Sequence, residues 1–113
     1  MRSVHVRLTI GAERDLSGIY RRRLAQRGAE GNDGAEALLN RLVAGIEGLA
    51  SYPEKGPVPG ELEAMGIREY RQLSLPPYRI IYWPEGATVT VMLIADARRD
   101  FRTLLQERVL GRG

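Results

Sequence analysis

Residues 78–100, YRIIYWPEGATVTVMLIADARRD, carry the strongest structural signal in the chain. Residues 78–83 are rich in β-branched and aromatic side chains, which predicts a strand. Pro, Glu and Gly at 84–86 are typical of a tight turn, and residues 87–95 are the most strand-like run of the sequence. Because the turn between them is so short, the two strands are expected to pair antiparallel.

The flanking segments extend this sheet. Residues 67–75 form a mixed strand that a Pro-Pro turn joins to the next one, so three consecutive strands make an antiparallel meander. Residues 3–10 alternate apolar and polar side chains, which is typical of a half-buried strand. After the sheet, residues 98–110 have apolar side chains at helical spacing, with Asp96 or Asp100 as the expected cap.

Two amphipathic helices are predicted between the first and second strands. Residues 12–27 combine an apolar stripe with acidic residues at the start and arginines at the end. Residues 35–50 have a wider apolar face, and Asp33 with Glu36 forms a capping-box pattern before it. A surface loop rich in Pro and Gly follows at 53–66. The predicted fold class is α+β in the order β-α-α-β-β-β-α, an antiparallel sheet packed by an N-terminal helical hairpin, with a C-terminal helix.

The composition predicts a single domain over residues 1–113 and excludes several functional classes. There is no cysteine and His5 is the only histidine, so no metal or cofactor is expected. His5 lies opposite the apolar face of its strand and is predicted to face solvent. The common nucleotide-binding and hydrolase motifs are absent. With no long apolar run and no export signal, the sequence predicts a cytoplasmic protein that does not enter a membrane.

The charge balance has two interpretations. There are 17 basic and 14 acidic residues, and Lys55 is the only lysine, so nearly all basic residues are arginine. The excess of arginine either marks a surface for an acidic partner or reflects a GC-rich genome. Composition alone favours the second interpretation. Any evidence for a binding surface must therefore come from where the arginines lie in the sequence.

Arg71 and Arg79 lie inside otherwise apolar strands and therefore need an explanation. One interpretation is an ion pair, Arg71 with Glu69 or Arg79 with Asp96, with the aliphatic stems lying on the core. The other is a cationic pocket on the sheet face that the helical hairpin leaves uncovered. The ion-pair interpretation is slightly favoured for each arginine.

Arg98 and Arg99 lie near the start of the last predicted helix, where positive charge opposes the helix dipole. Asp96 or Asp100 could neutralise them, but the conflict with local stability favours a functional role. The arginine run at residues 21–23 differs, because consecutive residues of a helix point in directions about 100° apart. That run is predicted to be a solvated helix end.

An ordered set of features across residues 9–110 resembles the RelE/ParE family of bacterial type II toxins. The set includes Asp15-Leu16, Ile19-Tyr20, Leu42, Ile46, Leu49, Tyr70-Arg71-Gln72-Leu73, Tyr78-Arg79-Ile80-Ile81-Tyr82 and Arg98-Arg99-Asp100. The resemblance implies a small antiparallel sheet with an N-terminal helical hairpin. It also implies the toxin of a toxin–antitoxin module, which causes growth arrest and supports plasmid stabilisation.

The family has two activities, and the side-chain inventory favours one. RelE-like members are ribosome-dependent mRNA endonucleases, whereas ParE-like members inhibit DNA gyrase. A nuclease needs one group to deprotonate the 2′-hydroxyl and another to protonate the leaving oxygen. Lys55 alone cannot form a RelE-type lysine pair, Asp96 stands where many relatives have a histidine, and no Tyr or His follows Tyr82. The resemblance therefore implies a ParE-like gyrase inhibitor. An arginine-based nuclease and an antitoxin-binding protein without toxicity are the alternatives.

The resemblance also implies partners and site residues. The expected residues for binding the target are Arg71, Arg79, Asp96, Arg98 and Arg99. If the chain is a nuclease, Arg71, Arg79 and Arg98 would clamp the phosphate. The cognate antitoxin is expected to present an acidic, partly disordered tail that wraps the hairpin. The residues expected to contact it are Leu16, Tyr20, Arg23, Arg79 and Tyr82.

Overall fold

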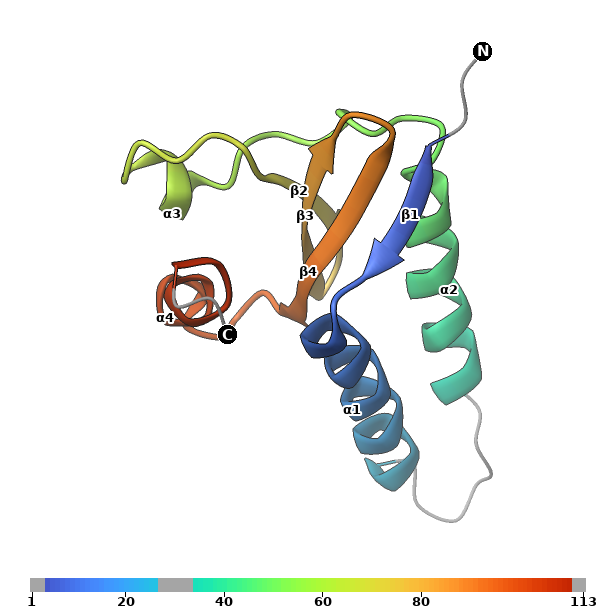
Figure 1. Ribbon diagram of the computed structural model, residues 1–113. Coiled ribbons are helices and arrows are strands. Elements are labelled where there is room, and N and C mark those ends of the chain that lie inside the picture. Colours follow the sequence, from blue (N-terminus) through green and yellow to red (C-terminus); the bar gives the residue numbers. More distant parts are fainter. Residues whose placement is uncertain (1–3, 27–33, 111–113) are drawn as a thin grey trace.

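The computed structural model describes residues 4–26 and 34–110, and in these residues four strands form one sheet (Figure 1). The strands are β1 (His5–Leu8), β2 (Arg71–Leu75), β3 (Tyr78–Glu85) and β4 (Thr88–Asp96). Their order across the sheet is β1-β4-β3-β2. β4 is therefore an inner strand, which agrees with its continuous run of apolar residues.

The three C-terminal strands form the predicted antiparallel meander, but β1 pairs with β4 in parallel. The expectation of a wholly antiparallel sheet is wrong for this strand. A parallel pair needs a long connection, and the segment between β1 and β4 supplies it. The pairing of β3 with β4 has a register shift: Ile81 is opposite Leu93 but Tyr82 is opposite Val91, so Met92 is an extra residue in β4.

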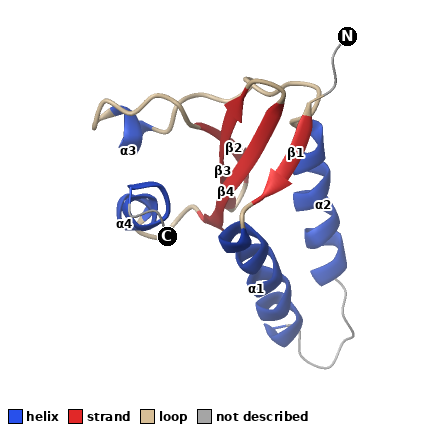
Figure 2. Ribbon diagram, viewed as in Figure 1, coloured by secondary structure: helices blue, strands red, loops and turns tan. Residues whose placement is uncertain are grey.

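The helical hairpin covers one face of the sheet (Figure 2). It consists of α1 (Ile10–Gln26) and α2 (Ala35–Gly48). The buried residues of this layer are Ala12, Ile19, Leu42, Ile46, Leu49, Ile80, Tyr82, Val89, Val91 and Ile94. Gly34 precedes α2 without a side-chain cap, and Asp33 of the predicted capping box lies outside the described residues.

The opposite face packs against short helical segments. These are α3 (Gly60–Glu63) and α4 (Phe101–Leu105), which continues into a π-helical turn, η1 (Gln106–Leu110). The buried residues of this second layer are Leu62, Ile81, Leu93, Ala95, Phe101 and Leu105. The loop predicted at 53–66 thus contains a short helix because Leu62 is drawn into the second layer.

Asp100 is the cap of α4, one of the two candidates from the sequence. Its carboxylate accepts hydrogen bonds from the Thr103 backbone N–H at 3.2 Å and from the Thr103 hydroxyl at 2.8 Å. These bonds lower the pKa of Asp100. The α+β class and the order of the predicted elements are confirmed. In the described part of the chain, no helix combines the length and apolar character needed to cross a membrane.

Candidate functional site

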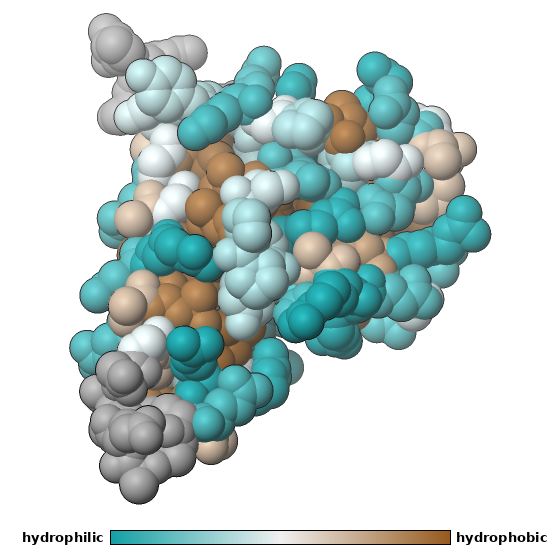
Figure 3. All heavy atoms as spheres, turned by 180° about the vertical axis from the view of Figure 1, so that it is seen from behind, coloured by the Kyte–Doolittle hydropathy of each residue, from teal (hydrophilic) through white to brown (hydrophobic). Residues whose placement is uncertain are grey.

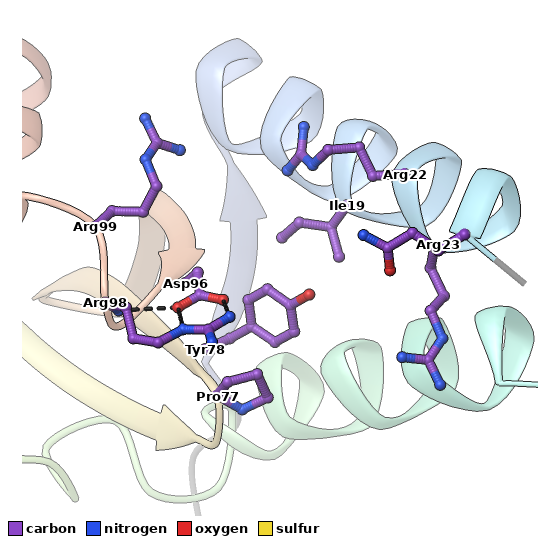
Figure 4. Close-up of a pocket in the computed structure, with 9 residues that line it drawn as sticks. Ile19, Arg22, Arg23, Pro77, Tyr78, Asp96, Arg98 and Arg99 are labelled. Atoms are coloured by element: carbon purple, nitrogen blue, oxygen red, sulfur yellow. Dashed lines mark hydrogen bonds and ion pairs between the residues drawn. The ribbon is translucent and has the colours of Figure 1, made fainter.

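A pocket of about 480 Å³ lies where three segments of the chain meet (Figure 4). The segments are the C-terminal half of α1, the turn between β2 and β3, and the connection from β4 to α4. Its lining residues are Ile19, Arg22, Arg23, Gln26, Pro77, Tyr78, Asp96, Arg98 and Arg99. The two turns meet because β3 and β4 pair with Tyr78 opposite Asp96.

Arg98 and Asp96 form a closely matched ion pair in this pocket. The Arg98 guanidinium donates to both carboxylate oxygens, from Nε at 2.9 Å and from Nη2 at 2.6 Å. The backbone N–H of Arg98 adds a third bond at 2.9 Å. These bonds lower the pKa of Asp96 to about 2, so the carboxylate is ionised at neutral pH. The Arg98 side chain is 83% exposed, so the pair adds little to stability and mainly orients the guanidinium.

The other three arginines of the pocket form no ion pair with a carboxylate among residues 4–26 and 34–110. They are Arg22, Arg23 and Arg99, and all three are exposed. Figure 4 shows Arg23 extending from α1 toward α2, whereas Arg98 lies beside Asp96 and Tyr78. Residues 21–23 are all exposed near the end of α1, as predicted for a solvated helix end, and Arg22 and Arg23 also line the pocket.

A second, smaller pocket of about 350 Å³ shares Arg23, Pro77 and Tyr78 with the first. It adds Arg41, whose Nη2 donates to the Pro76 carbonyl at 2.7 Å, and the apolar side chain of Leu38. Seen from behind, apolar surface shows between hydrophilic side chains on the side of the hairpin (Figure 3). The first pocket, called the arginine pocket below for its Arg22, Arg23, Arg98 and Arg99, therefore adjoins a second pocket that has both apolar and cationic lining residues.

Arg79 lies on the other face of the sheet and is held by neighbours within the fold. Its Nη1 and Nη2 each donate to a carboxylate oxygen of Glu61 at 2.9 Å, and Nη2 also donates to Gln72 Oε1 at 2.6 Å. The guanidinium stacks over Phe101 at 4.0 Å from the ring centre. Arg79 holds the pKa of Glu61 below its ordinary value. The ion pair expected in a strand is present, but its acid is Glu61 and not Asp96.

Arg71 fixes the loop that precedes α3. Its Nη1 donates to the Gly56 carbonyl at 3.0 Å, and the expected pair with Glu69 is not formed. Beside it, the Gln72 N–H donates to the Pro57 carbonyl at 2.9 Å, so the loop runs along the outer edge of β2. A Cβ on Gly56 would lie 1.9 Å from the backbone carbonyl oxygen of Gln72, so only glycine fits there.

The residues expected to contact an antitoxin differ in accessibility. Tyr82 is fully buried, and its hydroxyl accepts a hydrogen bond from the Gly56 N–H at 3.1 Å. Burial raises the pKa of this phenol. Tyr82 is thus a core residue, and its prediction as a surface contact is corrected. Leu16 and Tyr20 on α1 are half-buried, and Arg23 is exposed at the pocket.

The structure brings together four of the predicted site residues: Arg23, Asp96, Arg98 and Arg99. It separates Arg71 and Arg79 from them. Sequence reasoning missed Arg22 and Tyr78 as members of the site. Strand pairing could have pointed to Tyr78, but its exact partner depends on the extra residue at Met92, for which the sequence has no local signal.

The pocket can bind anions but is poorly equipped for proton transfer. Guanidinium groups stay protonated at all physiological pH values. His5 is exposed on β1 and is not a lining residue. In the part of the chain that the structure describes, no cluster of His, Cys, Asp and Glu could hold a metal ion.

Solved structures of similar fold include two from toxin–antitoxin systems and one of a toxin in the free state. The chromosomal ParDE system of P. aeruginosa matches with a TM-score of 0.67 and 18% identity, covering 83% of this chain and 96% of that chain. The RelBE2 toxin–antitoxin complex of Mycobacterium tuberculosis matches at 0.58 and 22%, covering 85% and 93%. A double arginine-to-alanine mutant of E. coli RelE in the free state matches at 0.51 and 17%, covering 97% of both chains. At these identities the likeness shows the fold.

The family follows from the sequence model of the ParE toxin of type II toxin–antitoxin systems (parDE), which matches residues 6–101. A search of curated proteins found no match. The matched range includes all but the first residue of β1, the hairpin, the meander and the Arg98–Arg99 turn. The chain therefore belongs to the ParE family and is a toxin of a type II toxin–antitoxin system.

Proposed function

We propose that this toxin arrests growth by binding DNA gyrase and that it does not cleave RNA. One observation carries the proposal: a pocket with four arginines contains no pair of groups suited to proton transfer near neutral pH. Such a site suits binding of an anionic or hydrogen-bonding surface by oriented guanidinium groups. Arg98 and Arg99 are the proposed target-binding residues, with Asp96 orienting Arg98.

The chemistry of the pocket argues against a nuclease. Cleavage at a 2′-hydroxyl needs a base and an acid with pKa values near the working pH. Asp96 has a pKa of about 2 and is bound on both oxygens by Arg98, so it is a weak base and no acid at neutral pH. Arg71 and Arg79, which would have clamped the phosphate, are engaged by Gly56 and Glu61.

One observation favours the alternative, a ribosome-dependent mRNA endonuclease. The phenol of Tyr78 lies in the pocket beside Arg98, and tyrosine is one of the side chains that can serve as a general acid or base. In that case Tyr78 would be the catalytic group and Tyr78→Phe would abolish cleavage. The test of the proposal therefore includes a ribosome assay.

A cognate antitoxin is the second proposed partner. The similar solved structures from P. aeruginosa and M. tuberculosis are of toxin–antitoxin systems. In this chain, half-buried Leu16 and Tyr20 on α1 adjoin the exposed cation of Arg23. An acidic tail with apolar residues would match this combination, and it would fold as it binds.

The deciding experiment compares two assays with the same purified protein. We expect dose-dependent loss of gyrase supercoiling activity, reversed by the antitoxin, and no cleavage of mRNA on translating ribosomes. Cleavage on ribosomes together with unaffected gyrase would overturn the proposal, and loss of that cleavage in Tyr78→Phe would establish the alternative.

A further inference from the structure

We infer that the arginine pocket binds the phosphodiester backbone of a nucleic acid, and that this nucleic acid is the DNA held by gyrase. The choice of DNA rests on the proposed function, whereas recognition of phosphate follows from the pocket itself. The toxin would then contact both components of the gyrase–DNA complex.

The charge in the pocket is out of balance. Four guanidinium groups line it and Asp96 is the only carboxylate among its lining residues, so three positive charges are in excess. The formal net charge of the whole chain is also +3. Grouped like charges repel one another, and a bound polyanion removes that repulsion while it releases its own counterions.

The arginines stand on two sides of the pocket. Arg22 and Arg23 belong to α1, whereas Arg98 and Arg99 belong to the connection between β4 and α4 (Figure 4). A volume of about 480 Å³ exceeds that of a single phosphate group. Cations on separate elements suit the repeated charges of a backbone, and the Tyr78 hydroxyl adds a neutral donor of the kind that contacts phosphate oxygens.

The lining favours a phosphodiester over an acidic peptide. A peptide segment generally anchors itself by burying apolar side chains, as well as by charge. Of the two apolar side chains of the lining, Ile19 is only 3% exposed, which leaves the single ring of Pro77 as exposed apolar surface. What remains accessible is mainly guanidinium, amide and phenol, and these are the groups that bind a backbone without reading its sequence.

The test measures binding of a short fluorescent DNA duplex by anisotropy over a range of NaCl concentrations, without gyrase. We expect wild type to bind with a Kd of about 10⁻⁴ to 10⁻⁶ M, as in non-specific recognition. Arg22→Ala/Arg99→Ala is expected to bind at least about tenfold more weakly. The plot of log association constant against log salt concentration, which falls with salt, should become less steep by about 2.

The matched control is Arg14→Ala/Arg21→Ala. It removes the same charge from exposed positions of α1 that do not line the pocket, and it is expected to keep nearly the wild-type slope. Arg22→Gln/Arg99→Gln repeats the test with side chains that retain their polarity. Thermal unfolding of each variant confirms that the fold is intact.

Three results would overturn the inference. One is an equal loss of DNA binding in the pocket variant and the control, which would show that DNA is attracted by the overall positive charge of the protein and not by the pocket. Another is displacement of DNA by poly-glutamate at a lower charge concentration than by unlabelled DNA, which would identify a carboxylate site. The third is tighter binding of single-stranded RNA than of duplex DNA, which would reject DNA as the ligand.

The two proposals fail separately. Because the binding assay contains no gyrase, DNA binding through the pocket without any effect on supercoiling would reject the proposed function and the assignment of the DNA to gyrase, but it would leave the recognition of phosphodiester by the pocket standing. Inhibition of supercoiling by a protein that binds no DNA would reject the present inference alone.

Discussion

Arg108 and Asp15 are 93 residues apart in the chain and form a two-pronged ion pair, with nitrogen–oxygen distances of 2.6 and 2.9 Å. The same groups bind the backbone of β4: Asp15 accepts from the Ile94 N–H at 3.0 Å, and Arg108 donates to the Met92 carbonyl at 2.9 Å. The pairing of β1 with β4 ends at Leu8 and Val91. Beyond the end of β1, the ion pair therefore supplies hydrogen bonds to the β4 backbone of the kind that a neighbouring strand would supply.

Removing this pair is expected to destabilise the fold strongly. Asp15→Ala leaves the guanidinium of Arg108 and the Ile94 N–H without their acceptor, at an expected cost of about 2–4 kcal/mol. A double-mutant cycle with Arg108→Ala, measured by urea unfolding, should give a coupling energy of about 1–3 kcal/mol. Arg14→Ala, an exposed change in the same helix, should stay within about 0.5 kcal/mol. Additive single mutants would contradict this role.

Gly56 and Gly48 form a matched pair with opposite expected effects. A Cβ at Gly56 would lie 1.9 Å from the Gln72 oxygen, whereas a Cβ at Gly48 would meet nothing within 4 Å. Gly56→Ala should therefore destabilise the protein by more than about 2 kcal/mol. Gly48→Ala, near the end of α2, should be neutral or stabilise it by up to about 1 kcal/mol. Thermal unfolding checks both, and a harmless Gly56→Ala would mean that the loop does not need to run so close to β2.

The pair of Glu61 and Arg79 should make stability depend on pH. Because Arg79 lowers the pKa of Glu61 in the folded state, the pair stabilises the fold above the ordinary pKa of glutamate. That stabilisation is lost as the pH falls through the lowered value. Glu61→Gln should therefore cost about 1–3 kcal/mol at pH 7, and its difference in stability from wild type should narrow as the pH falls below the ordinary pKa of glutamate.

Glu63→Gln is the control for this measurement. Glu63 belongs to the same short helix, but its pair with Arg68 is largely exposed. Its replacement should change the free energy of unfolding by less than about 0.5 kcal/mol at pH 7. A constant gap between Glu61→Gln and wild type from neutral to acid pH would argue against the charged contact with Arg79.

Arg98→Ala/Arg99→Ala should separate toxicity from folding. Both side chains are exposed, so the free energy of unfolding should hardly change. Growth arrest on induction should weaken markedly because the proposed target-binding cations are gone. The measurement is the growth of induced cells, with protein levels compared by immunoblot and Arg14→Ala/Arg21→Ala as the charge-matched control. Undiminished growth arrest by a folded double variant would remove Arg98 and Arg99 from the site.

Much of the fold could be predicted from local patterns. The alternation at residues 3–10, the β-rich run after Tyr78 and the helical stripes of the hairpin all depend on neighbours in sequence. The parallel pairing of β1 could not be predicted, because it depends on where the chain returns after the hairpin and two further strands. The short helix α3 could not be predicted for a related reason. Its residue Leu62 packs into a core layer whose other members are distant in the sequence, so no local pattern indicates the helix.

The candidate site was only partly predictable. Asp96, Arg98 and Arg99 were found because they are adjacent in sequence and conflict with the helix that follows. From the sequence, Arg22 can be predicted only as part of an exposed helix end, because a helical wheel does not show which other segments of the chain lie beside that helix.

The α+β class, the order of elements and the family resemblance can all be predicted from the chain alone, because they follow from periodicity, propensity and ordered motifs. Which arginines are available to a partner depends instead on the contacts that the folded chain makes. Arg79 is neutralised by Glu61 and Arg71 is bound to the loop at Gly56, whereas Arg99 has no carboxylate partner among the described residues. A guanidinium is equally charged in every context, so its role depends on which acceptors the fold brings within hydrogen-bonding distance.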